Sequence, residues 1–272
     1  MSGALQAVFQ NQRSFRAAPG QQAYTTPGAY SWVAPTGVCN VSVFVVGGGS
    51  SGAGNRYFTM NGGGGGASAY TNNITVIPGN SYSFRVGTGA YTGAGSPTVS
   101  NEKKSKFVCN PIAGGGGGDN CSGASFLTAG TVIAGSGGSG GVGGAGAYNG
   151  NAYGIGGGAG GAGGYSGAGG KGSTCAGTCF FSNGTNGSGG GGGGGSQGGN
   201  GGGVGILGES TSGNRGYAAI NNLQNGFPGS GGCGKTYGGG GGGNGNCGGN
   251  GAVRIIWPGC ARLFPTTRTA DE

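Results

Sequence analysis

Residues 237–257 read YGGGGGGNGNCGGNGAVRIIW, so that six consecutive glycines lead within a few residues into a short apolar run. The run at 252–257 contains a valine, two isoleucines and a tryptophan, which are residue types of a buried β-strand. A disordered polyglycine stretch gives no reason for a core strand to follow it so closely. The junction therefore indicates that the glycine run is itself structured.

Glycine dominates the composition, with 82 of 272 residues. Ordering a residue costs roughly 1–2 kcal/mol of backbone entropy, and glycine loses the most freedom of any residue. A hydrophobic content of 33% cannot offset that cost through side-chain burial alone. The chain therefore has either a small core with long flexible insertions or an arrangement ordered by its backbone.

Strand patterns lie at both ends of the chain. Residues 41–46 alternate with the period of two that is typical of a strand, and residues 73–86 alternate on either side of Pro78-Gly79-Asn80, which predicts a β-hairpin. The run at 252–257 has no partner nearby in the sequence, and we expect it to return to the strand at 41–46.

The two tryptophans have a simple interpretation within this shell. Trp32 lies in a strand-like segment and Trp257 ends the C-terminal apolar run. We expect both to be core residues of the shell rather than a pair that stacks on a sugar.

Glycine runs of similar length recur at 62–66, 114–118, 189–195 and 238–243. A collagen helix needs glycine at every third residue and abundant proline, whereas residues 112–227 contain no proline. A flexible linker is the alternative, but isolated bulky residues separate the runs. Extended helices with three residues per turn can pack side by side when no Cβ separates their backbones, each N–H bonding a neighbour's carbonyl.

These patterns predict a mainly β and irregular fold, in which a β-sandwich-like shell from both chain ends frames a bundle of polyglycine-II helices. The expected divisions are an N-terminal docking leader (1–20), the β-strand part of the shell with the first glycine run (21–111), the glycine-rich polyglycine-II region (112–251), and the closing strand with the C-terminal tail (252–272).

The composition argues against an enzyme. The chain has no histidine, and its five acidic residues are widely separated, which leaves little chance of a general acid–base pair or a catalytic triad. We expect no catalytic residue, no cofactor and no metal site. The eight cysteines, among them a C-x3-C pair at 175–179, are expected to be structural thiols or to form one to three disulfides of open connectivity.

The formal net charge is +8, and the basic residues are scattered apart from one cluster at 103–106. No aromatic residues interleave with this cluster, so we expect no nucleic-acid binding. The sequence contains neither a secretory signal nor an apolar run of membrane-spanning length, so we expect no membrane association. If the protein acts outside cells, it would then have to leave the cell without a secretory signal, for example inside a virus particle that is released on lysis.

Three parts of the chain resemble glycine-rich virion proteins of tailed bacteriophages, including tail-fibre and fibre-tip proteins. They are YTTPGAYSWVAPTGVCNVSVFVVGGG at 24–49, ITVIPGNSYSFRVGTGA at 74–90, and GGNGAVRIIWPGCARLFPTT at 248–267. With the glycine runs, the resemblance covers about residues 8–268. It implies a virion location, on the surface or in the tail, with other virion proteins and a host surface glycan or protein as partners. It also implies self-association, with a trimer as one form.

Loops that concentrate aromatic and polar residues are the candidate binding sites for such a host partner. They lie at 55–60, 101–111, 174–183 and 209–217. The candidate contact residues are Asn55, Arg56, Tyr57, Phe58, Lys103, Lys104, Lys106, Phe180, Phe181, Arg215 and Tyr217. The alternative is a purely architectural virion protein, such as a capsid decoration or a fibre or collar segment, in which these loops only join neighbouring helices.

Overall fold

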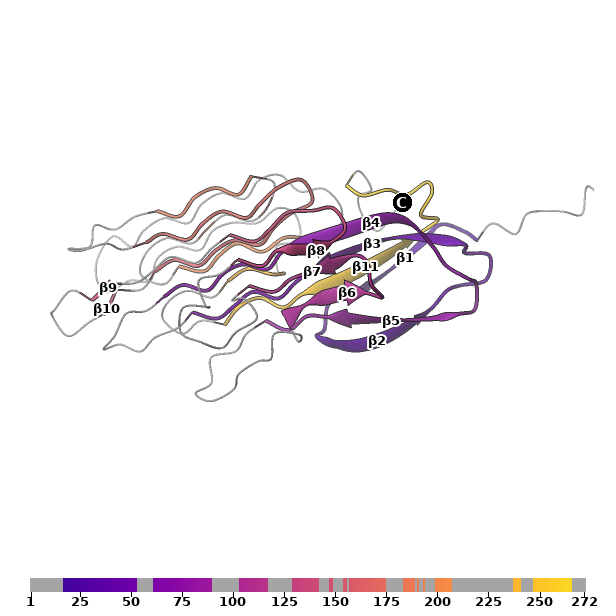
Figure 1. Ribbon diagram of the computed structural model, residues 1–272, viewed down its shortest axis with the longest axis horizontal. Coiled ribbons are helices and arrows are strands. Elements are labelled where there is room, and N and C mark those ends of the chain that lie inside the picture. The colour runs from indigo at the N-terminus through magenta and orange to yellow at the C-terminus, as the bar shows by residue number, and fades with distance from the viewer. Residues whose placement is uncertain are drawn as a thin grey trace, which may run out of the picture.

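The computed structural model describes residues 17–52, 61–89, 103–116, 129–141, 147–148, 154–155, 157–174, 183–188, 190, 193, 199–206, 237–240 and 247–265. The regular structure of these residues is mainly β, as the sequence predicts. Two packed sheets form one end of the molecule, and glycine-rich segments extend from them (Figure 1). A short hairpin of β9 (Ala147–Tyr148) and β10 (Gly154–Ile155) lies among these segments, far from the sheets.

Sheet A has four antiparallel strands, and its central pair joins the two ends of the chain. The order is β1 (Gly20–Tyr24), β11 (Ala252–Trp257), β3 (Asn40–Val46) and β4 (Ser68–Thr75). Within β11, Val253 lies opposite Val45 of β3 and opposite Tyr24 of β1. The expected return of the C-terminal run to residues 41–46 is therefore confirmed.

Sheet B has five antiparallel strands. The order is β2 (Gly28–Val33), β5 (Ser81–Val86), β6 (Ser105–Phe107), β7 (Ile112–Ala113) and β8 (Val132–Ala134). Both β7 and β8 come after residue 111, where the sequence analysis ended the first strand-rich part. The β-structure therefore continues into the glycine-rich region.

The hairpin predicted around Pro78 is wrong, although the turn itself is present. Asn80 donates its backbone N–H to the Ile77 carbonyl at 3.0 Å, and Gly79 has a φ of 81°, which suits a glycine in the third position of a type II turn. The strands on either side, however, belong to different sheets, because β4 pairs with β3 and β5 pairs with β2. The turn thus carries the chain from sheet A to sheet B.

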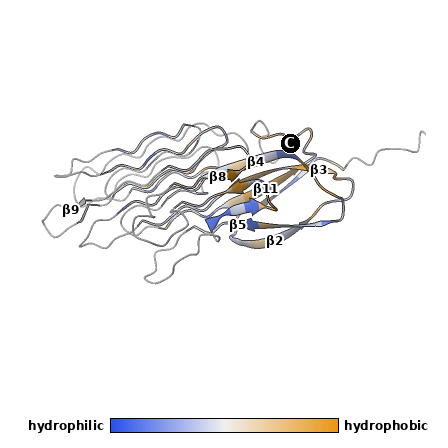
Figure 2. Ribbon diagram, in the orientation of Figure 1, coloured by the Kyte–Doolittle hydropathy of each residue, from blue (hydrophilic) through white to orange (hydrophobic). Residues whose placement is uncertain are grey.

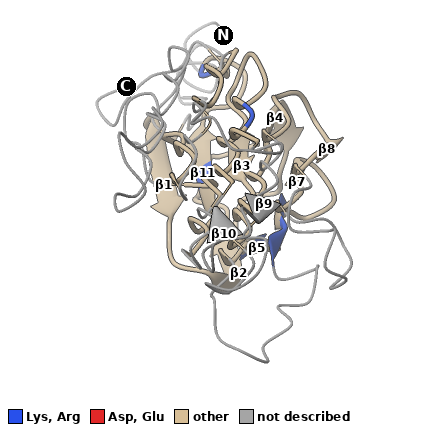
Figure 3. Cartoon of the chain, turned by 90° about the vertical axis from the view of Figure 1, so that its left-hand side faces the viewer, with Lys and Arg blue, Asp and Glu red and all other residues tan. Residues whose placement is uncertain are grey.

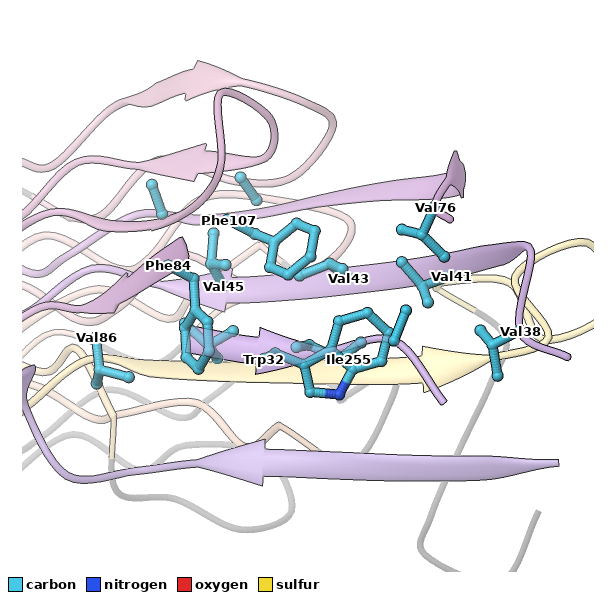
Figure 4. Packing of buried hydrophobic residues seen from close by; sticks show 14 of the residues in the cluster. Trp32, Val38, Val41, Val43, Val45, Val76, Phe84, Val86, Phe107 and Ile255 are labelled. Atoms are coloured by element: carbon cyan, nitrogen blue, oxygen red, sulfur yellow. The ribbon is translucent and has the colours of Figure 1, made fainter. Parts of the chain in front are cut away.

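The hydrophobic core lies between the two sheets (Figure 4). Sheet A contributes valines and an isoleucine from β3 and β11, and sheet B contributes Trp32, Phe84 and Phe107. The Trp32 ring lies 5.9 Å from the ring of Trp257, which packs against the same cluster, so the prediction that both tryptophans are core residues is confirmed. Hydrophobic residues are concentrated on the strands rather than in the glycine-rich segments (Figure 2).

The opposite face of sheet A is also buried. Phe44 and Ile256 on this face pack with Tyr165, Val204 and Phe264, which come from the glycine-rich segments and the C-terminal tail. The rings of Phe44 and Tyr165 stack with centroids 4.0 Å apart. Burial on both faces explains why β3 and β11 are almost continuously apolar, as strands covered on both sides generally are.

Backbone hydrogen bonds join the glycine-rich segments directly to one another. We call the described residues 47–52, 61–67, 114–116, 129–130, 137–141, 157–174, 183–188, 190, 193, 199–204, 237–240 and 247–251 the glycine bundle. Its bonds follow a three-residue period, which is clearest in 158–163, where successive N–H groups reach three neighbouring segments in turn. The six bonds, at 2.8–3.0 Å, run from Gly158 to Ser173, Ala159 to Gly199, Gly160 to Gly63, Gly161 to Gly170, Ala162 to Gly202 and Gly163 to Gly66.

This spacing leaves no room for side chains inside the glycine bundle. A Cβ on Gly65 would lie 2.0 Å from the Gly161 carbonyl oxygen, and one on Gly240 would lie 2.2 Å from that of Gly63. Residues 62–66 and 238–240 are all buried. The described parts of these two runs are therefore packed structure and not flexible linkers.

The tail after β11 closes over the outer face of sheet A. Asn72 of β4 binds both backbone groups of Phe264, since its side-chain amide donates to the carbonyl at 2.7 Å and its side-chain oxygen accepts from the N–H at 2.9 Å. The Phe264 ring is buried against Phe44 and Tyr165. Two hydrogen bonds and an aromatic cluster thus hold the tail in place.

Replacing Gly240 with valine tests the packing of the glycine bundle. We expect Gly240→Val to lower the free energy of unfolding by about 3 kcal/mol or more, because the added side chain must displace the backbone of residue 63. Chemical denaturation measures the change. Ala168→Val, at an exposed position of the same bundle, is the matched control and should stay within about 0.5 kcal/mol of the wild type. Equal stability of both variants would contradict the packing.

Replacing Asn72 with alanine tests the attachment of the tail. The variant loses both hydrogen bonds to Phe264, and we expect a loss of about 1–3 kcal/mol, measured by thermal unfolding. Leu263→Ala alters a 40% exposed side chain in the same tail and should cost clearly less. A larger loss for Leu263→Ala than for Asn72→Ala would mean that other contacts hold the tail.

Candidate functional site

The segments of the glycine bundle run lengthwise, towards the sheets or away from them. Residues 61–67 lead into β4 and therefore run towards sheet A. Hydrogen-bond partners whose numbers rise together mark parallel segments, and numbers that change in opposite senses mark antiparallel ones. Two segments are parallel to residues 61–67, directly or through a neighbour, and also run towards the sheets; they are 157–164 and 199–204. Two others are antiparallel and run away from the sheets; they are 137–141 and 168–173. We call the end remote from the sheets the tip.

Several described segments end or begin on the tip side of the molecule. One segment of each pair runs towards the tip, and the next described segment runs back from it. The paired ends of these described segments are Gly52 and Asn61, Gly89 and Lys103, Gly116 and Ala129, Thr174 and Asn183, and Gly240 and Cys247. The β9–β10 hairpin lies at the same end (Figure 1). The bundle therefore gathers, at one end, the described ends of segments that are far apart in the sequence.

Two of the four predicted binding loops have their described flanks on the tip side. Asn55, Arg56, Tyr57 and Phe58 lie outside the described residues, between flanks at Gly52 and Asn61. Phe180 and Phe181 also lie outside them, between flanks at Thr174 and Asn183. Both pairs of flanks are on the tip side.

The predicted loop at 209–217 has its described flanks near the sheets instead. Arg215 and Tyr217 lie outside the described residues, in the connection between Ile206 and Tyr237. Ile206 packs on the outer face of sheet A, and its carbonyl accepts a 3.0 Å hydrogen bond from the guanidinium of the buried Arg254. An antiparallel bridge between Val204 and Tyr237 holds the flanks together. The flanks of this loop are therefore not at the tip.

The predicted loop at 101–111 is partly a β-strand. Its residues 105–107 form β6 of sheet B, and Lys103, Lys104 and Lys106 differ in exposure. Lys103 is buried, with only 8% of its surface exposed, and its carbonyl accepts a hydrogen bond from Gly48 at 2.9 Å. Lys104 is half-buried and Lys106 is exposed. The expectation that all three present their charges on one exposed loop is corrected, because alternation along the chain turns neighbouring side chains to opposite sides of a sheet.

One further cation, Arg85, lies beside this group, and no pattern in the sequence indicates it. Arg85 of β5 lies directly opposite Lys106 of β6 in the antiparallel register. The two residues are 21 positions apart in the sequence, so no linear cluster reveals them. Only the pairing of β5 with β6 brings them together.

The described residues offer little for metal or thiol chemistry. Cys39, Cys109, Cys247 and Cys260 are free and exposed, and the other four cysteines lie outside the described part. Within the described ranges no group of three or more histidine, cysteine, aspartate or glutamate side chains could hold a metal ion. Burial, followed by the nearby Tyr30, raises the pKa of Tyr24, which lies at the core and not at the tip.

None of the described residues forms a helix long and apolar enough to cross a membrane.

Comparison with known proteins identifies the kind of domain. A family model described as a glycine-rich domain matches residues 25–258. This range contains every strand of sheet B and every strand of sheet A except β1. No curated protein matches the chain.

Proposed function

We propose that this chain, which belongs to the glycine-rich domain family, is a virion structural protein of a tailed bacteriophage, and the support for this role is the resemblance of residues 24–49, 74–90 and 248–267 to glycine-rich virion proteins. Its place is in a tail fibre or at a fibre tip, and the loops at the tip of the glycine bundle bind the host cell surface. The observation that carries the proposal is the gathering, at one end of the bundle, of the described ends of segments that are far apart in the sequence. Loops held on a rigid scaffold are the usual location of binding residues.

We propose that the glycine bundle is a set of polyglycine-II helices. A helix of three residues per turn directs successive N–H groups about 120° apart, so its bonds should reach three neighbours in rotation. The bonds from residues 158–163 follow this rotation. A bundle linked in this way on several sides suits a rigid platform, since its many backbone bonds act together.

The ends of sheet A support a polarity along the molecule. Gly20 of β1 lies opposite Trp257, where β11 ends, and this is the end of the sheet remote from the glycine bundle. A leader at 1–20 that docks to other virion proteins would therefore attach opposite the tip. Self-association, with a trimer as one form, belongs to the same proposal, and light scattering of the purified protein measures it.

The first experiment asks whether the protein is part of the virion and whether it binds cells. We expect mass spectrometry to find the chain in purified particles of the phage that encodes it. We also expect the purified protein to bind susceptible cells and to block infection. Presence in the particle without either cell activity would favour the architectural alternative, and absence from the particle would overturn both.

Phe180 and Phe181 test the tip as the binding surface. We expect the double variant Phe180→Ala/Phe181→Ala to require an at least about tenfold higher concentration to block infection, because buried aromatic residues carry much of the affinity at interfaces. Lys171→Ala changes an exposed residue within the glycine bundle and is the control. This variant should block infection as the wild type does. Both proteins should unfold at the same temperature, and equal blocking by the two would place binding elsewhere.

A further inference from the structure

The two sheets are joined along one side and open along the other. On the joined side, Tyr70 of β4 and Ser136, which follows β8, exchange backbone hydrogen bonds of 2.6 and 2.9 Å. On the other side lie β1 and β2, which are the opposite edge strands of sheets A and B. Figure 3, which views the sheets from the tip side, shows β2 at the margin of sheet B. Among the described strands, β2 pairs with β5 alone.

Alternate residues of β2 direct their backbone groups out of the sheet. The Ala34 N–H donates to the Asn80 carbonyl at 3.0 Å and so continues the ladder between β2 and β5. Every second residue of an antiparallel strand bonds its partner, and the residues in between face the other way. The outward residues are therefore Ala29, Ser31 and Val33. Within the described part of the chain, their backbone N–H and C=O groups form no hydrogen bond.

The features by which edge strands usually avoid other chains are missing from β2. Such features are short length, charged side chains, prolines and β-bulges. The six residues of β2, GAYSWV, include neither a charge nor a proline, and their register with β5 runs without a shift. The outward residues also have exposed side chains, and Val33 is 57% exposed. An open strand of this kind can accept a further strand at its edge.

The sequence of β2 fits an antiparallel copy of itself. A two-fold axis at Ser31 places this residue opposite its equivalent and places Ala29 opposite Val33 of the other copy. Each of these pairs can exchange two N–H···O bonds. No like charges meet, and the side chains that face each other are small or apolar. On the core side, the half-buried Tyr30 rings of the two copies lie diagonally opposite, at a spacing that aromatic side chains can bridge.

From this arrangement we propose that the edge of β2 is the contact between two copies of this chain, which pair antiparallel about Ser31 and join their B sheets into one continuous sheet. The same surface is used by both copies, so the assembly closes at two chains. Because the paired strands run in opposite directions, the two glycine bundles do so as well. The inference does not rest on the proposed function, since it concerns only the association of the purified protein.

The mass of the purified full-length protein in solution is the first test. We expect light scattering to give twice the mass of one chain and to show dissociation into single chains on dilution. Single chains at every concentration up to about 1 mM would overturn the inference. A trimer would overturn it as well, although the proposed function allows one, so the two proposals can fail separately.

Charges at position 31 test the register of the contact. We expect Ser31→Lys and Ser31→Asp each to raise the dissociation constant of the dimer about fivefold or more, because the new charge lies opposite an identical one. An equimolar mixture of the two variants should form a dimer with a dissociation constant within about twofold of the wild-type value, since opposite charges then meet. Wild-type affinity of either variant alone, or no recovery in the mixture, would overturn the inference.

Thr75→Lys is the matched control. It adds the same charge at an exposed position of β4, on the other sheet, and should leave the dissociation constant within about twofold of the wild-type value. At a concentration where all the proteins are single chains, Ser31→Lys and the wild type should unfold at the same temperature, since Ser31 is exposed. An equally large effect of Thr75→Lys on association would mean that net charge controls it, and the assignment to β2 would be wrong.

Discussion

The close approach of backbones in the glycine bundle is the constraint on which the rest of the molecule depends. Each N–H of residues 158–163 bonds a carbonyl of a neighbouring segment, and these bonds form only because no Cβ separates the chains. A net backbone hydrogen bond contributes about 0.5–1.5 kcal/mol, similar to the entropy lost in ordering one residue. The bundle can therefore be stable only when many segments bond on several sides at once, which explains the amount of glycine in the chain.

The two sheets supply what such a bundle lacks, which is a hydrophobic core that fixes the start and direction of its segments. Sheet A has a central role because both of its faces are covered. One face packs on sheet B, and the other packs on Tyr165, Val204 and Phe264. Residues 47–52, 61–67 and 247–251 are direct continuations of β3, β4 and β11. Because the backbone is continuous, the strand register of sheet A also sets how these bundle segments are aligned with one another.

The same geometry gives the molecule two distinct ends. The described segments of the bundle lead to the tip, and β1 begins at the opposite end of sheet A. In the proposed function, the tip loops provide recognition of the host surface and the remote end provides attachment to the virion. Such a division requires little side-chain chemistry, in keeping with a chain of which only 7% is charged.

The sequence by itself determined the mainly β character, the return of residues 252–257 to the strand at 41–46, the core positions of the tryptophans and the ordered state of the glycine runs at 62–66 and 238–240. These follow from local periodicity and from the cost of ordering glycine. Only the tertiary structure decided that β4 and β5 belong to different sheets. A Pro-Gly turn has the same local geometry whether the two strands that it joins lie in one sheet or in two sheets. It alone buried Lys103 and paired Arg85 with Lys106, because strand register depends on partners distant in the sequence.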